Sequence, residues 1–578
     1  MQEKIKKLII EALERLKIKE ANFNIEHPED LKNGDYSTNI AMVVDRKKFE
    51  TKTHKPTREE IADIIGGEIK KNLPLEIKEI KTAGSGFINF YLSQKFFSGK
   101  VEEILSTGGG SALGGNNLFS GKKIMIEYTD PNPFKPFHIG HLMTNAIGES
   151  IARILEASGA AVSRANYQGD VGLHVAKAIW RLLQDKKLQD QSLSIAEQSK
   201  NIGQAYALGA EAYEGEEKIK IEIDEINKEV YDRSNAKINV LYDWGFKVTM
   251  EAFEDLYKML GTKFDYYFLE SEMAPIGEGV VQANLDKIFE KSNGAVVFKA
   301  EKHDPKLHTR VFITSAGLPT YETKELGLTA EKFRTRPDTD LSIVITAKEQ
   351  MDYMRVVDKA LSLIHPEYEG KMLHITHGMM RFANGKMSSR KGNVITGESL
   401  VRETQVLVAE KTRDRSFGES AKEKIISDVA IAAIKYSILK QSTGGDIVYD
   451  FENSISFEGD SGPYLQYSFA RANSVLEKAK AENILPDFKV LPKEISEVEK
   501  LLYRFPEVVY RAASEYEPHY IANFLIELAR SFNSFYGNTM IVSKDDKTSP
   551  YKIALTFAFT FVMKKGLHLL GIEAPEKM

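Results

Sequence analysis

The sequence predicts an α/β protein built around a doubly wound, Rossmann-type parallel sheet. In 123–155 an apolar run leads through a proline-rich turn into apolar residues at helical spacing, which indicates a strand, a turn and a helix. A second strand pattern follows in 160–170, and strand, helix and strand in so short a length indicate a parallel, right-handed unit. From residue 428 onward helical patterns dominate, so a separate all-helical domain should follow the sheet.

The rest of the chain divides by composition. Apolar spacing in 1–16 predicts a helix and alternation in 87–92 predicts a strand, as expected of a small α+β domain. The glycines of 106–121 predict a flexible linker. Lysine- and glutamate-rich helical patterns fill about 176–262, which we interpret as an insertion with a solvated surface. The expected domains are 1–105, the linker 106–121, 122–375 with its insertion at about 176–262, 376–427 and 428–578.

Further strand patterns after the insertion are expected to complete the sheet. They span 264–272, 294–300, 309–314 and 341–347. Ligands of doubly wound sheets bind at the carboxyl ends of the strands. We therefore expect His138, after the first strand, and Asp170, after the second, to lie close together.

Bulk composition excludes some classes of protein and leaves others open. The chain has 578 residues, 42% of them apolar, so it should hold several domains with their own cores. A net charge of −5 gives no global basic signature, yet charges are screened beyond about 8 Å, so a local basic face could still bind RNA. The absence of cysteine excludes disulfides and cysteine-ligated zinc and fits a reducing compartment.

The first residues form a charged amphipathic pattern and not a signal peptide. No apolar run approaches the roughly 20 residues that a membrane span needs. We therefore expect a cytoplasmic protein without a membrane partner.

The turn before the first long helix carries His138, Gly140 and His141, with Lys135 shortly before them. Donors gathered at a helix N-terminus after a strand favour a phosphate site. Two histidines could also be half of a metal site, but no third ligand is near and no thiolate exists, so no metal is expected. Ordinary surface histidines are the remaining alternative.

A second motif lies in 376–396, where two glycines flank a basic loop. The loop contains Lys386, Met387, Ser388, Ser389 and Arg390. Taken alone, such a loop is usually only solvated. Together with the histidine turn upstream in a split doubly wound sheet, it favours a site for a phosphate-bearing ligand.

These two motifs resemble the HIGH and KMSKS motifs of class I aminoacyl-tRNA synthetases, at 138–141 and from Lys386 onward. The finer resemblance is to arginyl-tRNA synthetases. Similar blocks are PNPFKPFHIGHL, NYQGDVGLH, YETKELGL, GKMSSRKG and GPYLQYSFAR, with GDYSTNIAM and GSGFINF near the start and GLHLLGIEAPEKM at the end. The resemblance thus spans nearly the whole chain, and the insertion is its least specific part.

The resemblance implies an arginine–tRNA ligase. Such an enzyme converts L-arginine and ATP into arginyl-adenylate and pyrophosphate, and then transfers arginine to the 2′-hydroxyl of the terminal ribose of tRNA(Arg). Mg²⁺ is implied with ATP, because ATP phosphates normally carry it. The helical domain 428–578 would bind the anticodon and the domain 1–105 would touch the outer corner of the tRNA. A monomer is expected.

The resemblance also assigns roles to residues. Ser389 replaces the second lysine of KMSKS, and Lys135 would substitute for it. The expected catalytic residues are Lys135, His138, His141 and Lys386. The expected ATP-binding residues are His138, Gly140, His141, Gly169, Asp170, Met387, Ser388 and Arg390. The expected tRNA-binding residues are Tyr464, Gln466, Tyr467 and Arg471.

Recognition of arginine calls for paired carboxylate oxygens, because a guanidinium is a planar fork of donors. The expected arginine-binding residues are Glu127, Asn132, Glu270, Tyr321, Glu325 and Gln350. Glu325 stands where many relatives carry Asp. Each of these residues could singly be a surface acid or a core tyrosine, and only the set is specific.

Three other functions remain open on the sequence. One is a class I synthetase for lysine, glutamate or glutamine. Another is an inert paralogue that binds RNA through aromatic and arginine residues of the helical domain, although intact His138, His141 and Lys386 argue against it. The last is a small-molecule nucleotidyltransferase, which would not need the helical domain.

Overall fold

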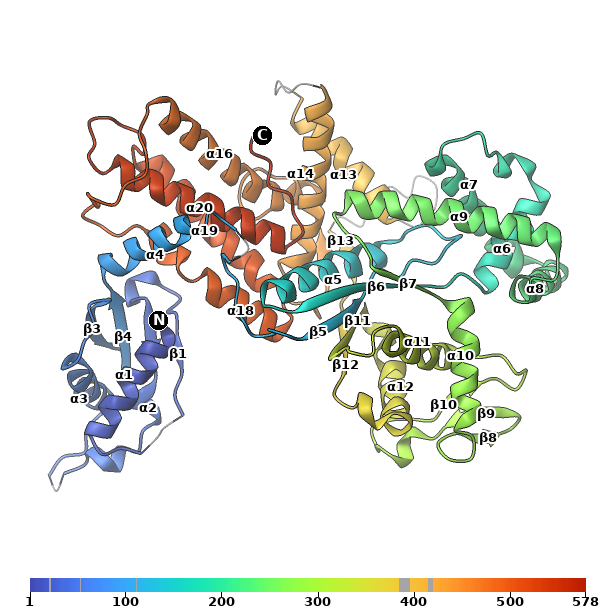
Figure 1. Cartoon of the computed structure of the whole chain (residues 1–578), viewed down its shortest axis with the longest axis horizontal. Coiled ribbons are helices and arrows are strands. Elements are labelled where there is room, and N and C mark those ends of the chain that lie inside the picture. Colours follow the sequence, from blue (N-terminus) through green and yellow to red (C-terminus); the bar gives the residue numbers. More distant parts are fainter. Residues whose placement is uncertain (20–21, 52, 111, 384–395, 414–418) are drawn as a thin grey trace.

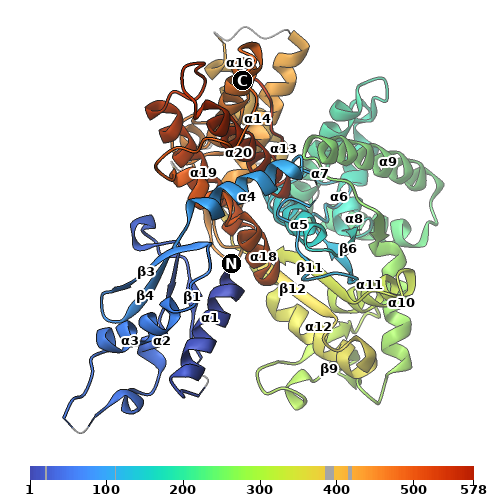
Figure 2. The ribbon, with the colours of Figure 1, turned by 60° about the vertical axis from the view of Figure 1, so that its left-hand side comes forward.

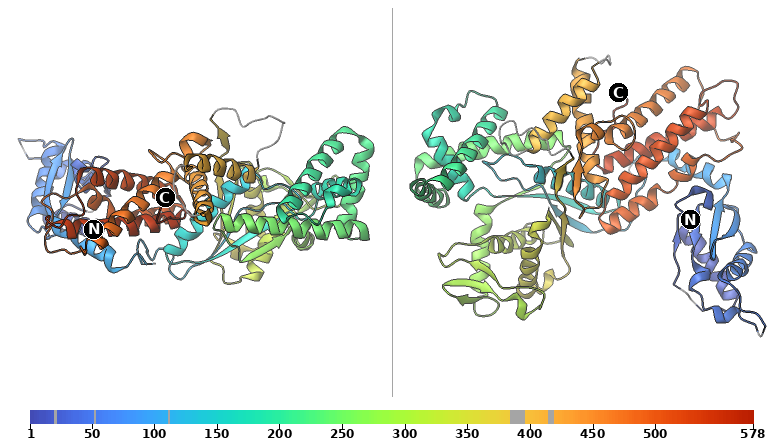
Figure 3. Two further views of the ribbon diagram at one scale, coloured as in Figure 1. Left: turned by 90° about the horizontal axis from the view of Figure 1, so that it is seen from above. Right: turned by 180° about the vertical axis from the view of Figure 1, so that it is seen from behind.

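The computed structural model describes residues 1–19, 22–51, 53–110, 112–383, 396–413 and 419–578. A central parallel sheet lies between an N-terminal domain on one side and a helical insertion on the other (Figure 1). The helical C-terminal domain packs on the sheet beside the N-terminal domain. Seen from above, the N-terminal domain and the insertion occupy opposite ends of the molecule (Figure 3).

The central sheet is doubly wound, as predicted. Its strand order is β12-β11-β5-β6-β7, and every neighbouring pair is parallel. The chain starts in the middle with β5, adds β6 and β7 on one side and then β11 and β12 on the other, so the order reverses at β5. The strands are β5 (Lys123–Glu127), β6 (Ala161–Gln168), β7 (Tyr266–Leu269), β11 (Leu341–Ala347) and β12 (Met372–His377).

Helices connect the strands. Between β5 and β6 runs α5 (Ile139–Ala157), whose apolar face packs on the sheet. The insertion between β6 and β7 consists of α6 (Leu173–Gln184), α7 (Ile195–Gly215), α8 (Glu217–Asp232) and α9 (Ala236–Met259). After β7 come α10 (Glu270–Ala283), α11 (Tyr321–Thr335) and α12 (Met351–Ile364).

Two glycines bring α10 and α11 together. A Cβ on Gly277 would lie 1.9 Å from Thr323 O, and a Cβ on Gly327 would lie 2.1 Å from Met273 O. Only glycine therefore allows the two helix backbones to approach so closely. This packing places the first turn of α10 against α11.

The prediction that 294–300 and 309–314 belong to the central sheet is wrong. They form β9 (Ala295–Phe298) and β10 (Arg310–Ile313) of a small antiparallel sheet with β8 (Glu290–Ser292). The connection between β9 and β10 contains no helix long enough for a parallel crossover, whereas antiparallel neighbours need only a short turn.

The N-terminal domain has its own antiparallel sheet, of order β1-β2-β4-β3. Its core combines aliphatic and aromatic side chains and includes Ile5, Ile65 and Phe90. The elements are α1 (Gln2–Arg15), β1 (Ile25–Glu26), β2 (Tyr36–Thr38), α2 (Ile40–Val43), α3 (Arg58–Lys70), β3 (Ile77–Ala83) and β4 (Phe87–Leu92).

Helix α4 (Gln94–Ser106) joins two cores (Figure 2). Phe97 packs in the N-terminal core, whereas Val101 packs in the core that the sheet shares with the C-terminal domain. The following glycine-rich segment is not the flexible connector that its composition suggested. Gly114, at φ +72°, lies so close to Phe505 that a Cβ would be 2.5 Å from the ring, and Leu113 is buried.

The C-terminal domain is helical. Its core includes a stacked pair of rings, Phe532 and Phe559, with centroids 3.9 Å apart. A short strand pair, β13 (Met380–Phe382) and β14 (Ile447–Tyr449), connects it to the sheet domain. The helices are α13 (Gly397–Lys411), α14 (Glu419–Leu439), α15 (Phe451–Ser454), α16 (Gly462–Ala481), α17 (Glu497–Leu502), α18 (Phe505–Glu515), α19 (His519–Asn538) and α20 (Ser549–Leu569). Within the described ranges, no helix is long and apolar enough to cross a membrane.

Candidate active site

The first turn of α5 places two imidazoles against each other. His138 is the N-cap residue, and its ring stacks on that of His141 with 3.4 Å between the centroids. The His138 N–H donates to Nδ1 of His141 at 3.2 Å, so the neutral His141 ring carries its proton on Nε2. Burial lowers the pKa of His138 to about 4, and burial and then His138 lower the pKa of His141 well below its usual value. Both rings are therefore uncharged at pH 7 and can donate hydrogen bonds.

Lys135 supplies the positive charge beside these rings. Its Nζ lies 5.5 Å from the ring centroid of Tyr206 on α7. Burial and then the neighbouring Lys177 lower the pKa of Lys135, while Glu270 opposes them. No carboxylate of the described residues lies within ion-pair distance of Lys135. The ammonium is thus available to an anion.

Backbone contacts connect this turn to the second motif. A Cβ on Gly140 would lie 3.0 Å from the His138 ring, so glycine leaves that ring in place. His138 also forms an antiparallel bridge with Thr396. The predicted loop residues fall within 384–395, outside the described residues, but the chain resumes at Thr396 directly beside His138. The residues concerned are Lys386, Met387, Ser388 and Arg390.

A cluster of acids occupies the carboxyl end of β5 and the facing side of α11. Glu127 forms a buried ion pair with Lys332. Asp130 accepts a hydrogen bond from the N–H of Tyr167 at 2.7 Å, and burial and then Glu127 raise its pKa well above the usual value. Burial and then Glu127 also raise the pKa of Glu325 to about 8. Asp130 and Glu325 therefore tend to stay protonated, because they are buried beside Glu127 and Lys332 is the cation that pairs with this cluster.

Glu270 and Asn132 converge over Gly169 at the end of β6. Glu270 Oε1 accepts a hydrogen bond from Lys324 Nζ. Asn132 Oδ1 accepts the N–H of Gly169 at 3.1 Å. A Cβ on Gly169 would lie 2.3 Å from Asn132 Oδ1 and 2.9 Å from Glu270 Oε2, so the two acceptors meet above this glycine.

Replacing Gly169 by alanine is expected to raise the KM for a ligand held by these two acceptors by about tenfold or more. The added Cβ must push Asn132 Oδ1 or Glu270 Oε2 aside, and misplacement by about 1 Å can cost up to 10²-fold. The matched control is Gly279→Ala on α10, where nothing lies within 4 Å. That change should leave the KM unchanged and stabilise the fold by up to about 1 kcal/mol. Equal KM values in both variants would contradict the assignment.

Three other predicted residues have distinct surroundings. Asp170 is fully buried, and its Oδ2 accepts from Ser271 Oγ at 2.6 Å and from Tyr242 OH at 2.8 Å. Its Oδ1 accepts from the N–H of Ser271 at 2.9 Å, so a contact with ATP would require some of these bonds to open. Tyr321, at the start of α11, is 72% exposed. Gln350 ends the short helix after β11 and accepts from Tyr353 OH at 3.2 Å. Tyr321 lies four residues before Glu325, and both Tyr321 and Gln350 are exposed.

Comparison with known proteins decides the family. Residues 100–451 match the model of the class I tRNA synthetase catalytic domain of arginine type. The chain belongs to the arginyl-tRNA synthetase family. Residues 3–92 match the N-terminal domain of arginyl-tRNA synthetases, and residues 465–578 match the DALR anticodon binding domain. The synthetase is thus a class I arginine–tRNA ligase, and its substrates are arginine, ATP and tRNA.

Relatives match this synthetase over nearly its whole length. An arginine–tRNA ligase of Clostridium perfringens is 30% identical over 89% of this chain and 91% of its own. One of Halothermothrix orenii is 29% identical over 100% of this chain and 99% of its own. The arginyl-tRNA synthetase structure of Thermus thermophilus covers 100% of both chains with a TM-score of 0.76 at 23% identity, which confirms the predicted fold.

The predicted tRNA contacts of the synthetase lie on α16. Arg471 is held between two rings, 4.7 Å from that of Tyr467 and 5.2 Å from that of Tyr536, and donates to Asn533 Oδ1 at 2.6 Å. Tyr464 OH accepts from the amide of Asn533 at 2.9 Å. A cavity of about 760 Å³ opens beside Arg471.

Gln466 differs from its neighbours because it is fully buried. Its amide donates to Asp428 O at 3.2 Å and to Glu573 O at 2.8 Å, which joins α14 to the C-terminal segment. A contact between Gln466 and tRNA would require these bonds to open.

Sequence reasoning missed four charged residues of the site. Lys324 and Lys332 neutralise predicted acids, Asp130 joins the acid cluster, and burial raises the pKa of Asp358 to about 6. The spacing of Lys324 and Lys332 on α11 did not by itself predict a role in the site, because two lysines eight residues apart also fit a solvated helix.

Proposed function

We propose that this enzyme binds ATP at the first turn of α5 and arginine at the adjoining carboxyl ends of β5 and β6. The observation that supports the proposal is the meeting of two neutral imidazoles and one unpaired ammonium with a buried acid cluster. In the first reaction the carboxylate of arginine attacks the α-phosphate of ATP, and pyrophosphate leaves. This step needs placed donors and no protein nucleophile.

On the ATP side, Nε2–H of His141 and the ring of His138 would donate to phosphate oxygens, and Lys135 would supply charge as pyrophosphate forms. Gly140 would let the nucleoside approach the backbone. Lys386 and Arg390 would close over the pyrophosphate, with Met387 and Ser388 beside ATP. Gly169 and Asp170 would border the nucleotide.

Mg²⁺ would arrive with ATP. No cluster of three or more His, Asp or Glu residues that could hold a metal was found in the described part of the chain. Bound to the phosphates, the ion would neutralise their charge. The protein's own contribution is then the donor set around His141 and Lys135.

On the arginine side, Glu270 and Glu325 would face the guanidinium, and Asn132, Tyr321 and Gln350 would complete the pocket. Glu127 would act mainly through the acid cluster, because Lys332 already pairs with it. A site that pairs every donor of the substrate can reject analogues by about 10⁴ to 10⁵, so no editing is needed. A guanidinium suits this arrangement better than the single ammonium of lysine.

The KM for arginine is expected to fall as the pH rises from 6.5 to 8.5. The pKa of Glu325 is about 8 in the free site, so below pH 8 a proton must leave before the carboxylate can pair with the guanidinium. The change should approach tenfold per pH unit below 8. In Glu325→Gln the slope should vanish and the KM should be high throughout. A flat profile in the unaltered enzyme would contradict this role.

In the second reaction the arginyl group would pass to the 2′-hydroxyl of the terminal ribose. The cavity beside Arg471 has the character of a base-binding site, because Tyr467 and Tyr536 offer faces for stacking and Arg471 offers charge. The N-terminal domain would touch the outer corner of the tRNA. We also propose that the enzyme acts as a monomer, since the described residues of one chain supply both the histidine turn and the acid cluster. A location in the cytoplasm is part of the same proposal.

One assay tests the function: ATP–pyrophosphate exchange with each of the twenty amino acids, with and without total tRNA. Stimulation by arginine alone is the expected result. Stimulation by lysine, glutamate or glutamine instead would assign another specificity. Silence with every amino acid would favour an RNA-binding protein without catalysis.

A further inference from the structure

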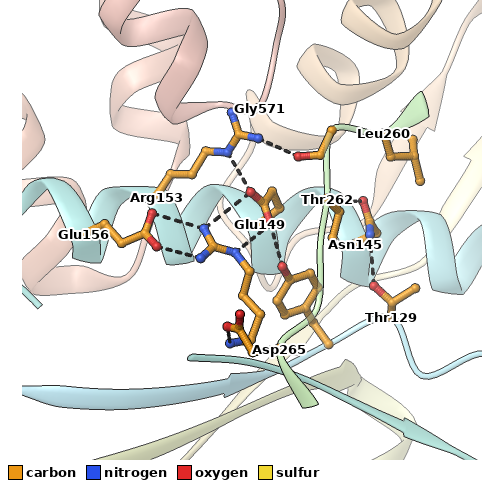
Figure 4. Close-up of polar contacts among 12 residues, drawn as sticks. Thr129, Asn145, Glu149, Arg153, Glu156, Leu260, Thr262, Asp265 and Gly571 are labelled. Carbon is orange, nitrogen blue, oxygen red and sulfur yellow. Dashed lines mark hydrogen bonds and ion pairs between the residues drawn. The ribbon is translucent and has the colours of Figure 1, made fainter. Parts of the chain in front are cut away.

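Helix α5 carries a row of polar residues that leads away from the active site. Starting at His141, every fourth residue is polar, and positions four apart lie on one face of a helix. The row continues with Asn145, which is fully buried, Glu149, which is 3% exposed, and Arg153 (Figure 4). Buried polar groups in such a row need partners, and these partners belong to other parts of the chain.

The near end of the row holds the segment that follows β5. Asn145 Nδ2 donates to Thr129 Oγ1 at 3.0 Å, and Thr262 Oγ1 donates to Asn145 Oδ1 at 3.2 Å. Thr129 has φ +81°, a backbone conformation that is strained for a β-branched residue. Asn145 therefore helps to hold a strained turn next to the arginine side of the site.

The middle of the row is a buried carboxylate. Glu149 accepts from Arg153 Nε at 2.7 Å, Arg164 Nε at 3.0 Å and Tyr128 OH at 2.5 Å. Although burial opposes ionisation, Arg164 and Arg153 keep the pKa of Glu149 below its usual value. Because Gly148 has no Cβ, the ring of Tyr128 packs directly on the helix.

The far end of the row meets the C-terminal domain. Arg153 donates through Nη1 to His568 O at 2.9 Å and through Nη2 to Gly261 O at 2.6 Å. The buried amine of Lys435, on α14, completes this junction, and burial lowers its pKa to about 7. It donates to Leu260 O at 2.6 Å and to Gly571 O at 2.7 Å.

We propose that Arg153 and Lys435 are positioning residues for the first step of the reaction. The inference rests on the proposed role of His138 and His141. Arg153 bonds the far end of α5 to Gly261, after the insertion, and to His568 of the C-terminal domain. Lys435 bonds the adjoining Leu260 and Gly571 to each other, so the two residues together set where α5 and its two imidazoles lie. Fifteen residues separate His138 from Arg153, about 22 Å along the helix at 1.5 Å per residue.

The reason for expecting an effect at this distance is mechanical. Glu149 pairs with Arg164 of β6, and Arg153 is hydrogen-bonded to two backbone carbonyls outside the helix. A continuous helix held in this way moves as one body, so a shift at Arg153 is passed to the first turn. A shift of about 1 Å at reacting groups can lower the rate by up to 10²-fold. Substrate contacts other than those of His138 and His141 would be retained, so the rate should change more than the KM values.

The test is a double-mutant cycle between Arg153→Met and His138→Asn, measured by ATP–pyrophosphate exchange and normalised to the burst of adenylate, which counts folded sites. Arg153→Met alone should lower kcat by about tenfold or more, with KM for arginine and ATP changed less than about threefold. In the His138→Asn background the same change should cost less than about threefold. The effects of substitutions at sites so far apart normally add. Non-additive effects on kcat would therefore distinguish positioning from general destabilisation.

Lys435→Met should behave in the same way, although Lys435 lies outside α5. The matched control is Arg15→Met in the N-terminal domain, which removes an ion pair with Glu68. It should leave kcat for exchange unchanged, both in the unaltered enzyme and in His138→Asn. Equal losses from Arg153→Met in both backgrounds, or no loss in either, would overturn the inference. If His138→Asn alone leaves exchange unaffected, the proposed role of His138 fails, while exchange with arginine would still uphold the function.

Discussion

Replacement of Lys135 by alanine should lower arginine-dependent ATP–pyrophosphate exchange by about 10² to 10³-fold. Loss of one well-placed donor to the transition state typically costs this much. The two imidazoles beside it are neutral at pH 7, because burial lowers the pKa of His138 to about 4 and holds that of His141 well below its usual value. Lys135 is therefore the cation among these three side chains, and the histidines cannot replace its charge.

The control for Lys135 is Lys123→Ala at the opposite end of β5. Lys123 pairs with Asp338 at the amino edge of the sheet, away from the strand ends that hold the site. Its replacement should leave exchange within about twofold of the unaltered enzyme, because exposed pairs contribute about 0 to 1 kcal/mol. Near-normal exchange in Lys135→Ala would refute the proposal that Lys135 substitutes for the missing lysine of the second motif.

Replacement of Glu270 by glutamine should raise the KM for arginine by about 10- to 10²-fold while changing the KM for ATP less than about threefold. A hydrogen bond to a charged partner is worth about 1.5 to 3 kcal/mol, which corresponds to this range. Glu270 Oε2 faces the pocket beside Asn132 Oδ1, so it is placed to receive a cationic substrate. Steady-state exchange kinetics with each substrate varied in turn measure the difference.

Two further variants serve as controls for the effect of Glu270→Gln. Glu272→Gln, in the same turn of α10, borders a shallow surface hollow and should leave both KM values unchanged. Glu270→Gln also leaves Lys324 buried without its carboxylate, which could disturb the fold. In the double variant with Lys324→Met that charge is gone. A normal KM for arginine in the double variant would show that Glu270 serves only to neutralise Lys324.

The sheet and its helices were predictable because local patterns encode them. Alternating strand and helix signals from 123 onward imply a parallel sheet, and such a sheet determines where a ligand binds. The small sheet of β8, β9 and β10 was not predictable, because the sequence of a short apolar strand does not determine which other strand it pairs with. The packing of the glycine segment was missed for a similar reason. Its composition predicts a flexible backbone, but it does not reveal that the ring of Phe505 packs against Gly114.

The sequence was enough to predict which residues gather at the candidate site, but not which charged residues pair with one another there. Motif spacing brought His138, His141 and Lys135 together. The pairs Lys324–Glu270 and Lys332–Glu127 were missed, because each joins residues far apart in the chain. The raised pKa of Glu325 could not be foreseen either, since it results from burial beside Glu127. Such effects depend on tertiary packing, which no local spacing reveals.

The way α4 and the glycine segment pack has a practical consequence for dissecting this enzyme. Phe97 and Val101 of one helix belong to different cores, and Gly109 and Gly114 cover Phe561 and Phe505 of the C-terminal domain. A fragment beginning at residue 122 would therefore expose aromatic side chains that the intact chain covers, and it should aggregate on expression. Helix α4 and the glycine segment therefore belong with the C-terminal domain that they cover, and a boundary for expression should be placed before them.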